Sequence, residues 1–240
     1  MMENFGNQFP DGNSPKEPLD PHLVEPQRYY ESLNEQEKES LLAWREKTMS
    51  PTMQLLWQRT EANDPTVEQI SMGNGKSIEV ASTDDEKVIW TFGLSGCAAT
   101  IVFTENEDGT RNCILTHYPP TQRSVNMLKL GDLIDASIKM SHAKTKNAVL
   151  MLPGEWEQDA ETKKWELRAE DQTTVNALTF AIQAKLGTDV QITLEPYNET
   201  KDFGQKDHGT LTVYVPPSGR GDARYQTWYG GGKLTATELA

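Results

Sequence analysis

The chain has 240 residues, enough for one sizeable hydrophobic core, and its 36 Asp and Glu against 23 Lys and Arg give a net charge of −13. An acidic surface repels phosphate backbones and anionic lipids, which argues against nucleic-acid and membrane partners. The sequence contains no run of about 18 apolar residues, so no membrane span is predicted. Two cysteines are too few for a disulfide framework.

The first segment, residues 1–30, is polar and rich in proline, and we expect it to be disordered or loosely packed. It lacks the apolar stretch of a secretory signal peptide. This absence predicts a cytoplasmic protein, or one delivered by a route that needs no signal peptide.

A helical N-terminal extension is predicted over 31–66. Asn34 carries the capping-box pattern that begins a helix over 35–47. Ser50, followed directly by proline, caps a second helix over 51–61.

The pattern then changes to short strands and turns, which predicts an α+β catalytic domain over 67–230 and a tail over 231–240. Residues 153–164 and those after 216 are expected to form loops. The expected strands are 78–80, 88–90, 98–104, 112–118, 148–152, 165–169, 190–194 and 210–215, and the expected helices are 124–140 and 173–187. The predicted fold is a mostly antiparallel β-sandwich flanked by helices.

The residues that favour chemistry lie around Cys97, which follows Gly96 on a loop entering an apolar strand. If the hairpin after Cys97 turns near Asp108, the residue opposite Cys97 falls at 118–120, which brings His117 near the thiol. The two side chains meet only if the strand register turns them to one face. An imidazole beside a thiol activates it as a nucleophile.

Two further groups complete this candidate site. Backbone N–H groups of Ser95 and Gly96, beside Cys97, are candidates to hold an oxyanion. Thr91, six residues before Cys97, is the candidate hydroxyl that orients the imidazole of His117.

The second cysteine, Cys113, is predicted to lie opposite about Phe103. That position is about 20 Å from Cys97 along the hairpin, too far for a disulfide. We therefore expect Cys113 to be a buried strand residue with no role in chemistry.

The other histidines and a short tripeptide suggest no second site. His22, His142 and His208 lack the spacing of metal ligands, so we expect no metal and no cofactor. His142 is expected to be solvated just past a helix, and His208 to lie in a turn. The tripeptide at 220–222, Arg-Gly-Asp, is interpreted as a chance match to an adhesion motif.

The segment from Thr91 to His117 resembles the cysteine-dependent glutamine deamidases typified by the cytotoxic necrotizing factor catalytic domain, the Burkholderia lethal factor and the chemoreceptor glutamine deamidase. The tetrapeptide at 94–97, Leu-Ser-Gly-Cys, matches the first two, and a histidine one hairpin later matches His117. Thr91 matches the threonine that the last two use. The hairpin between Cys97 and His117 is longer than we expect for the family.

This resemblance implies a β-sandwich wrapped by helices and hydrolysis of a glutamine side-chain amide in a target protein. Cys97 would attack the carboxamide and form a thioester, His117 would protonate the departing ammonia and activate water, and Thr91 would orient His117. Such chemistry suits a toxin or effector, and we expect a monomer. The alternatives are a non-catalytic protein-binding module on the same fold and a cysteine peptidase.

Overall fold

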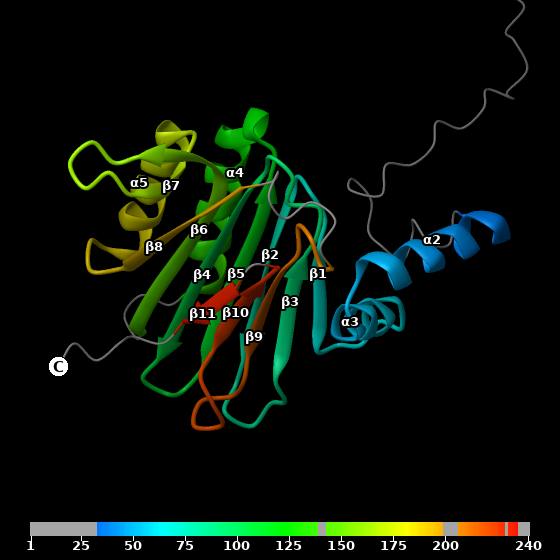
Figure 1. Ribbon diagram of the computed structural model, residues 1–240. Helices are drawn as coiled ribbons and strands as arrows, with labels where there is room; N and C mark the ends of the chain where they lie inside the picture. The colour runs from blue at the N-terminus through cyan, green and yellow to red at the C-terminus, as the bar shows by residue number, and fades with distance from the viewer. Residues whose placement is uncertain (1–32, 139–142, 199–205, 229, 235–240) are drawn as a thin grey trace, which may run out of the picture.

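The computed structural model describes residues 33–138, 143–198, 206–228 and 230–234. The chain forms two sheets that face each other, with helices on their outer sides (Figure 1). The predicted α+β sandwich is therefore confirmed. The predictions for residues 1–30, His22 and His142 lie outside the described residues.

The elements follow the chain in the order of the labels in Figure 1. The helices are α2 (Glu35–Thr48), α3 (Pro51–Glu61), the short η1 (Pro120–Gln122), α4 (Arg123–Ser137) and α5 (Gln172–Leu186). The strands are β1 (Val67–Ile70), β2 (Asn74–Val80), β3 (Lys87–Thr91), β4 (Ala98–Asn106), β5 (Arg111–Tyr118), β6 (Ala143–Gln158), β7 (Trp165–Ala169), β8 (Gln191–Tyr197), β9 (Leu211–Val215), β10 (Arg224–Thr227) and β11 (Gly230–Lys233).

The first sheet has the strand order β1-β3-β9-β10-β11, and the second has the order β2-β5-β4-β6-β7, with β8 paired to β6. Every pairing is antiparallel except β1 with β3 and β6 with β8. Among the described residues, no helix combines the length and the apolar character that crossing a membrane requires.

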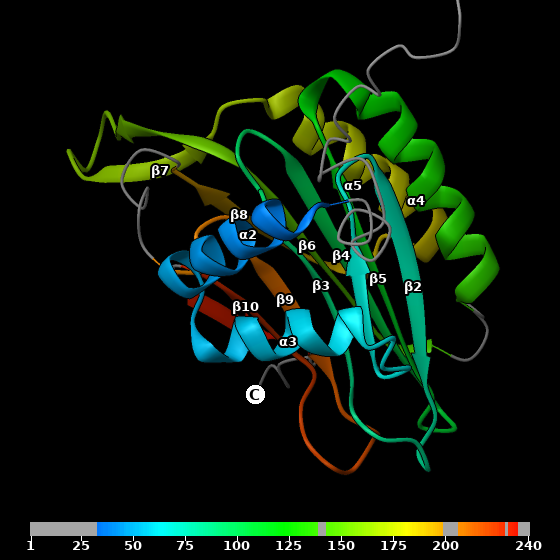
Figure 2. The ribbon, with the colours of Figure 1, turned by 90° about the vertical axis from the view of Figure 1, so that its right-hand side faces the viewer.

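The hydrophobic core lies between the sheets, where alternate side chains of both sheets point inward. On the outer side of the second sheet, α4 and α5 pack through a separate apolar cluster that includes Leu130, Ile134, Leu178 and Ile182. On the outer side of the first sheet, α3 packs Trp57 against Trp90 of β3, with 5.6 Å between ring centroids. Figure 2 shows these two helical layers on different sides of the sandwich.

The structure differs from the sequence prediction in the loop expected at 153–164. β6 continues to Gln158 and pairs with β7, from Gly154 opposite Ala169 to Gln158 opposite Trp165. The sequence there is polar because this part of the hairpin is largely exposed. Pairing with β7 keeps these residues in a strand although they lack alternating apolar side chains.

The glycine-rich end of the chain also differs from the loop and tail that we expected. β10 and β11 add two strands to the first sheet, and Leu234 is buried in the core at 1% exposure. A Cβ at Gly231 would lie 2.2 Å from the carbonyl oxygen of Tyr225, so glycine permits the close approach of β11 to β10. The predicted tail was therefore wrong for 231–234.

Candidate active site

His117 lies on β5, Cys97 directly precedes the adjacent strand β4, and both side chains are placed on the inward face of the sheet. His117 of β5 is paired with Ala99 of β4, and Cys97 lies two residues before Ala99. Directly paired residues share a face, as do residues two apart on a strand. Cys97 and Ala99 both belong to the core between the sheets. Cys97 and His117 are therefore diagonal neighbours across the strands, with Cα atoms separated by about 7–8 Å.

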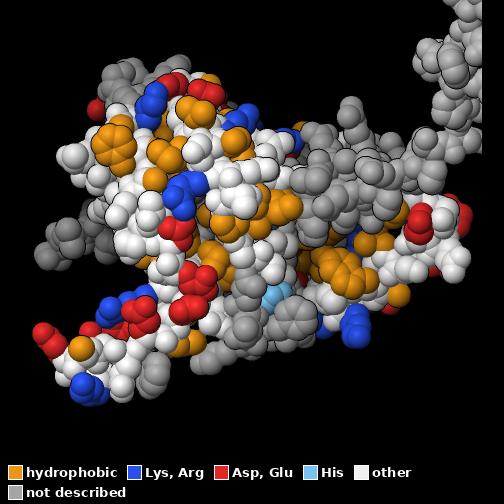
Figure 3. All heavy atoms as spheres, turned by 90° about the horizontal axis from the view of Figure 1, so that it is seen from above, with side chains coloured by type: hydrophobic (Ala, Val, Ile, Leu, Met, Phe, Trp, Pro, Cys, Tyr) orange, Lys and Arg blue, Asp and Glu red, His pale blue; other side chains and the backbone are white. Residues whose placement is uncertain are grey.

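Several strands begin or end beside these two residues, so the site lies at one end of the sandwich. β3 ends at Thr91 opposite Leu211, and β2 begins at Asn74 opposite His117. This end is uppermost in Figure 1. Figure 3 looks onto it and shows hydrophobic side chains reaching the surface between charged ones.

The imidazole of His117 is held in one orientation by Thr91. His117 Nδ1 lies 2.8 Å from Thr91 Oγ1, and Thr91 Oγ1 also lies 2.7 Å from the carbonyl oxygen of Ile70. A hydroxyl has one proton, and the Ile70 carbonyl can only accept, so Thr91 donates to Ile70 and accepts from Nδ1–H of His117. In the neutral imidazole this leaves Nε2 as the basic nitrogen.

Strand alternation explains why Thr91 reaches His117. Along β3, Ile89 faces the core between the sheets and Trp90 faces α3. Thr91, two residues after Ile89, therefore points inward again. Thr91 belongs to the first sheet and His117 to the second, so their hydrogen bond joins the two sheets.

The loop that carries Cys97 is shaped by two glycines and by one contact with Gly209. Gly93 and Gly96 both have φ of 73°, in the left-handed region that favours glycine. Leu94 is fully buried, and its N–H donates to the carbonyl oxygen of Gly209 at 2.9 Å. A Cβ at Gly209 would lie 3.1 Å from the nitrogen of Leu94, so the close contact depends on glycine there.

The predicted oxyanion donors differ in what their backbone groups do. The N–H of Ser95 donates to the carbonyl oxygen of Gly93 at 2.8 Å, which closes a tight turn. Ser95 N–H is thus turned into the loop, and its predicted role as an oxyanion donor is not supported. Gly96, directly before Cys97, remains the candidate of the two.

The sequence reasoning did not identify the side chains that surround Cys97. Its sulfur lies 3.5 Å from the sulfur of Met72, and its carbonyl oxygen accepts from the Tyr197 hydroxyl at 2.7 Å. Tyr197 packs edge-on against Trp228, and Trp228 packs against His208, with centroid distances of 5.3 and 5.5 Å. In the sequence these aromatic residues resemble any core aromatic. Only the adjacency of His208 to a glycine marked that segment as a turn, which the structure confirms.

Cys113 is separate from this site, as predicted. It is paired with Phe103, is fully buried, and forms no disulfide with Cys97. Burial raises the pKa of the Cys113 thiol far above its usual range. Cys113 is therefore an inert core residue, and Cys97 is the candidate nucleophile of the two.

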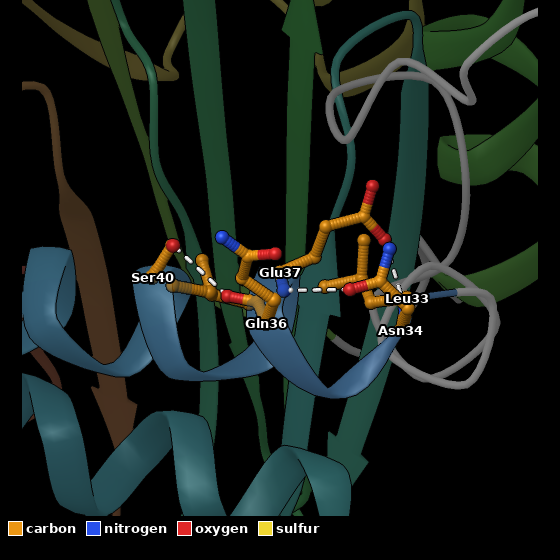
Figure 4. A pocket seen from close by; sticks show the side chains of 6 residues that line it. Leu33, Asn34, Gln36, Glu37 and Ser40 are labelled. Atoms are coloured by element: carbon orange, nitrogen blue, oxygen red, sulfur yellow. Dashed lines mark hydrogen bonds between the residues drawn. The ribbon is translucent and has the colours of Figure 1, made fainter.

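A hollow at the start of α2 lies on the helical extension and is formed by the helix cap itself (Figure 4). Asn34 and Glu37 form a reciprocal capping box there, and the Ser40 hydroxyl donates to the carbonyl oxygen of Gln36. These polar groups serve the helix end. Among the described residues, no group of three or more His, Cys, Asp or Glu side chains is placed to hold a metal ion.

Comparisons with known proteins give little beyond this geometry. No protein-family model matches the sequence, and no curated protein matches it. A solved structure, the C-terminal domain of CNFy from Yersinia pseudotuberculosis, aligns over 66% of this chain and 55% of that chain, with 10% sequence identity and a TM-score of 0.33.

Proposed function

We propose that this chain is a cysteine hydrolase that deamidates a glutamine side chain of a target protein. Cys97 is the nucleophile, His117 the acid and base, and Thr91 the residue that orients His117. The observation that carries the proposal is the hydrogen bond between His117 Nδ1 and Thr91, because it leaves Nε2 as the basic nitrogen. The imidazole shares the inward face of the sheet with the thiol.

In the first half of the reaction, His117 Nε2 takes the proton from Cys97 Sγ, and the thiolate attacks the carbon of the glutamine carboxamide. The C=O electron pair moves to oxygen, and the N–H of Gly96 stabilises the resulting oxyanion. The C–N bond then breaks while His117 Nε2–H protonates the leaving nitrogen. Ammonia departs and a thioester to Cys97 remains.

In the second half, a water molecule attacks the thioester carbon and gives a proton to His117 Nε2. The C–S bond breaks, glutamate is released, and the proton returns to the sulfur of Cys97. Thr91 keeps the imidazole in one orientation through both halves, because Nδ1 stays bonded to its hydroxyl. The balance is one water consumed and one ammonia released.

The burial of Cys97 favours deamidation over peptide-bond cleavage. Cys97 is only 4% exposed. A scissile main-chain amide has chain on both sides and needs an open cleft, whereas a glutamine carboxamide ends a slender side chain. A buried thiol therefore suits a side-chain amide better than a main-chain amide.

The test is intact-mass analysis of lysate proteins treated with the native chain, with Cys97→Ser and with Cys113→Ser. We expect the native chain and Cys113→Ser to raise the mass of a target by about one dalton, because –OH replaces –NH₂ on the carbonyl. Cys97→Ser should leave the mass unchanged. Target cleavage would indicate a peptidase, and a target mass that no protein changes would contradict the proposed activity and favour a binding module.

A further inference from the structure

Two partly buried apolar side chains, Met72 and Trp228, pack against the core at the end of the sandwich that carries Cys97. Met72 precedes β2 and touches the Cys97 sulfur, while Trp228 follows β10. Both pack against the core between the sheets without being fully buried. Cys97 itself is buried, with Met72 against its sulfur and with Tyr197 between its carbonyl group and Trp228.

The indole of Trp228 is held from two sides. Tyr197 meets it edge-on at an interplanar angle of 73°, and His208 packs against it at 54°. Tyr197 is fixed in turn by its hydrogen bond to the carbonyl oxygen of Cys97. Trp228 is therefore oriented by the same loop that carries the nucleophile.

The apolar side chains of Met72 and Trp228 match the apolar part of a glutamine side chain. Between the main chain and the carboxamide lie two methylene groups, which have no polar atoms and gain from contact with a thioether and an indole. Asparagine has one methylene fewer, so its carboxamide stops short of a buried thiol.

We propose that Met72 and Trp228 pack the methylene arm of the substrate, and that Trp228 is a specificity-determining residue favouring glutamine over asparagine. The inference rests on the proposed function. Trp228 contacts the aliphatic part of the substrate and takes no part in proton transfer. Its loss therefore weakens binding of the arm and leaves the chemistry of Cys97 and His117 in place.

The test measures alkylation of Cys97 in the full chain carrying Cys113→Ser, with iodoacetamide and with N-butyl iodoacetamide. If the two side chains bury two methylenes of the butyl group, the butyl reagent should react about 16-fold faster, since each buried methylene is worth a factor of about four. Trp228→Ala should reduce this ratio about fourfold, because only Met72 then packs the butyl chain, while the iodoacetamide rate changes by less than about twofold. The matched control is Trp156→Ala, because Trp156 is a 41% exposed tryptophan on β6.

The inference is overturned if folded Trp228→Ala keeps the ratio, or if Trp156→Ala loses it equally. If Trp228→Ala does not fold, Trp228→Phe and Trp228→Gln replace it. We expect Trp228→Phe to keep the faster reaction of the butyl reagent and Trp228→Gln to lose it. The inference is also contradicted if Trp228→Ala loses the faster reaction of the butyl reagent but still prefers glutamine over asparagine as strongly as the native chain. If the chain with Trp228 in place deamidates no target but still reacts faster with the butyl reagent, only the proposed function is refuted.

Discussion

The hydroxyl of Thr91 accepts a hydrogen bond from Nδ1–H of His117 across the interior of the sandwich, at 2.8 Å. Both side chains are fully buried, and the hydroxyl proton is committed to the Ile70 carbonyl. One buried contact therefore joins the two sheets, sets the tautomer of the imidazole and leaves Nε2 as the unprotonated nitrogen of the neutral ring.

Replacing Thr91 should separate these effects. Thr91→Val has nearly the same shape but removes the acceptor, so the buried Nδ1–H of His117 loses its partner at a cost of about 1–3 kcal/mol in unfolding free energy. We expect the rate of Cys97 alkylation and of deamidation to fall about 10- to 100-fold, as for other orienting partners. Thr91→Ser keeps the hydroxyl and should retain most of both rates. Equal rates for valine and serine would contradict an orienting role.

The two cysteines should differ sharply in reactivity. In the folded chain we expect iodoacetamide to modify Cys97 near neutral pH, whereas Cys113 reacts only after unfolding because burial raises the pKa of its thiol. Peptide mapping by mass spectrometry assigns the modified residue. His117→Ala should slow the reaction of Cys97. Labelling of Cys97 no faster than that of an ordinary thiol would remove the basis of the proposed nucleophile.

Asp207 links the helical extension to the Cys97 loop. Its N–H donates to the carbonyl oxygen of Thr48 at 2.8 Å, and its carboxylate accepts from the N–H of Ser50 at 2.7 Å. Two residues later, Gly209 accepts from Leu94 of the loop. The joint between α2 and α3 is thus two hydrogen-bonded steps from the loop that carries the candidate nucleophile.

A pair of variants at Asp207 tests this link. Asp207 has φ of 61°, a left-handed conformation that Asn tolerates and Ala does not. Asp207→Ala should destabilise the fold by about 2 kcal/mol and speed hydrogen exchange at the N–H of Leu94. Asp207→Asn keeps an acceptor oxygen, so it should neither destabilise the fold nor speed hydrogen exchange at Leu94. Unchanged exchange at Leu94 in folded Asp207→Ala would show that the loop is held independently of the helices.

Stability in acid should depend on Asp64, between α3 and β1. Hydrogen bonds from Thr66 and then Arg59 lower the pKa of Asp64 to about 2. A carboxyl group whose pKa is lower in the folded than in the unfolded chain stabilises the fold above the unfolded value, near 4. That contribution is lost as the pH falls through about 2.

The corresponding variant is Asp64→Asn, measured by thermal unfolding across this range. We expect a loss of about 1 kcal/mol at neutral pH, after allowance for the partial exposure of the group, and a smaller difference from the native chain toward pH 2. A constant difference between the two proteins at every pH would contradict the assignment of the shift.

Local patterns in the sequence were sufficient for much of the fold. Helix caps at Asn34 and Ser50 and alternating apolar strands are short-range signals, so the helical extension and the hairpin of β4 and β5 could be predicted. The glycine-rich β11 and the polar end of β6 were missed, because pairing with a neighbouring strand holds them and their own composition resembles loop.

For the candidate site, the sequence by itself determined the residue types: a thiol preceded by two glycines, a histidine one hairpin later and a threonine six residues before the thiol. It also placed Cys113 too far along the hairpin to matter. Register decided whether Cys97 and His117 share a face, and packing of two sheets decided that Thr91 meets Nδ1. These are contacts between strands distant in sequence, so only the tertiary structure sets them, and it alone brings Met72 and Trp228 to the core beside Cys97.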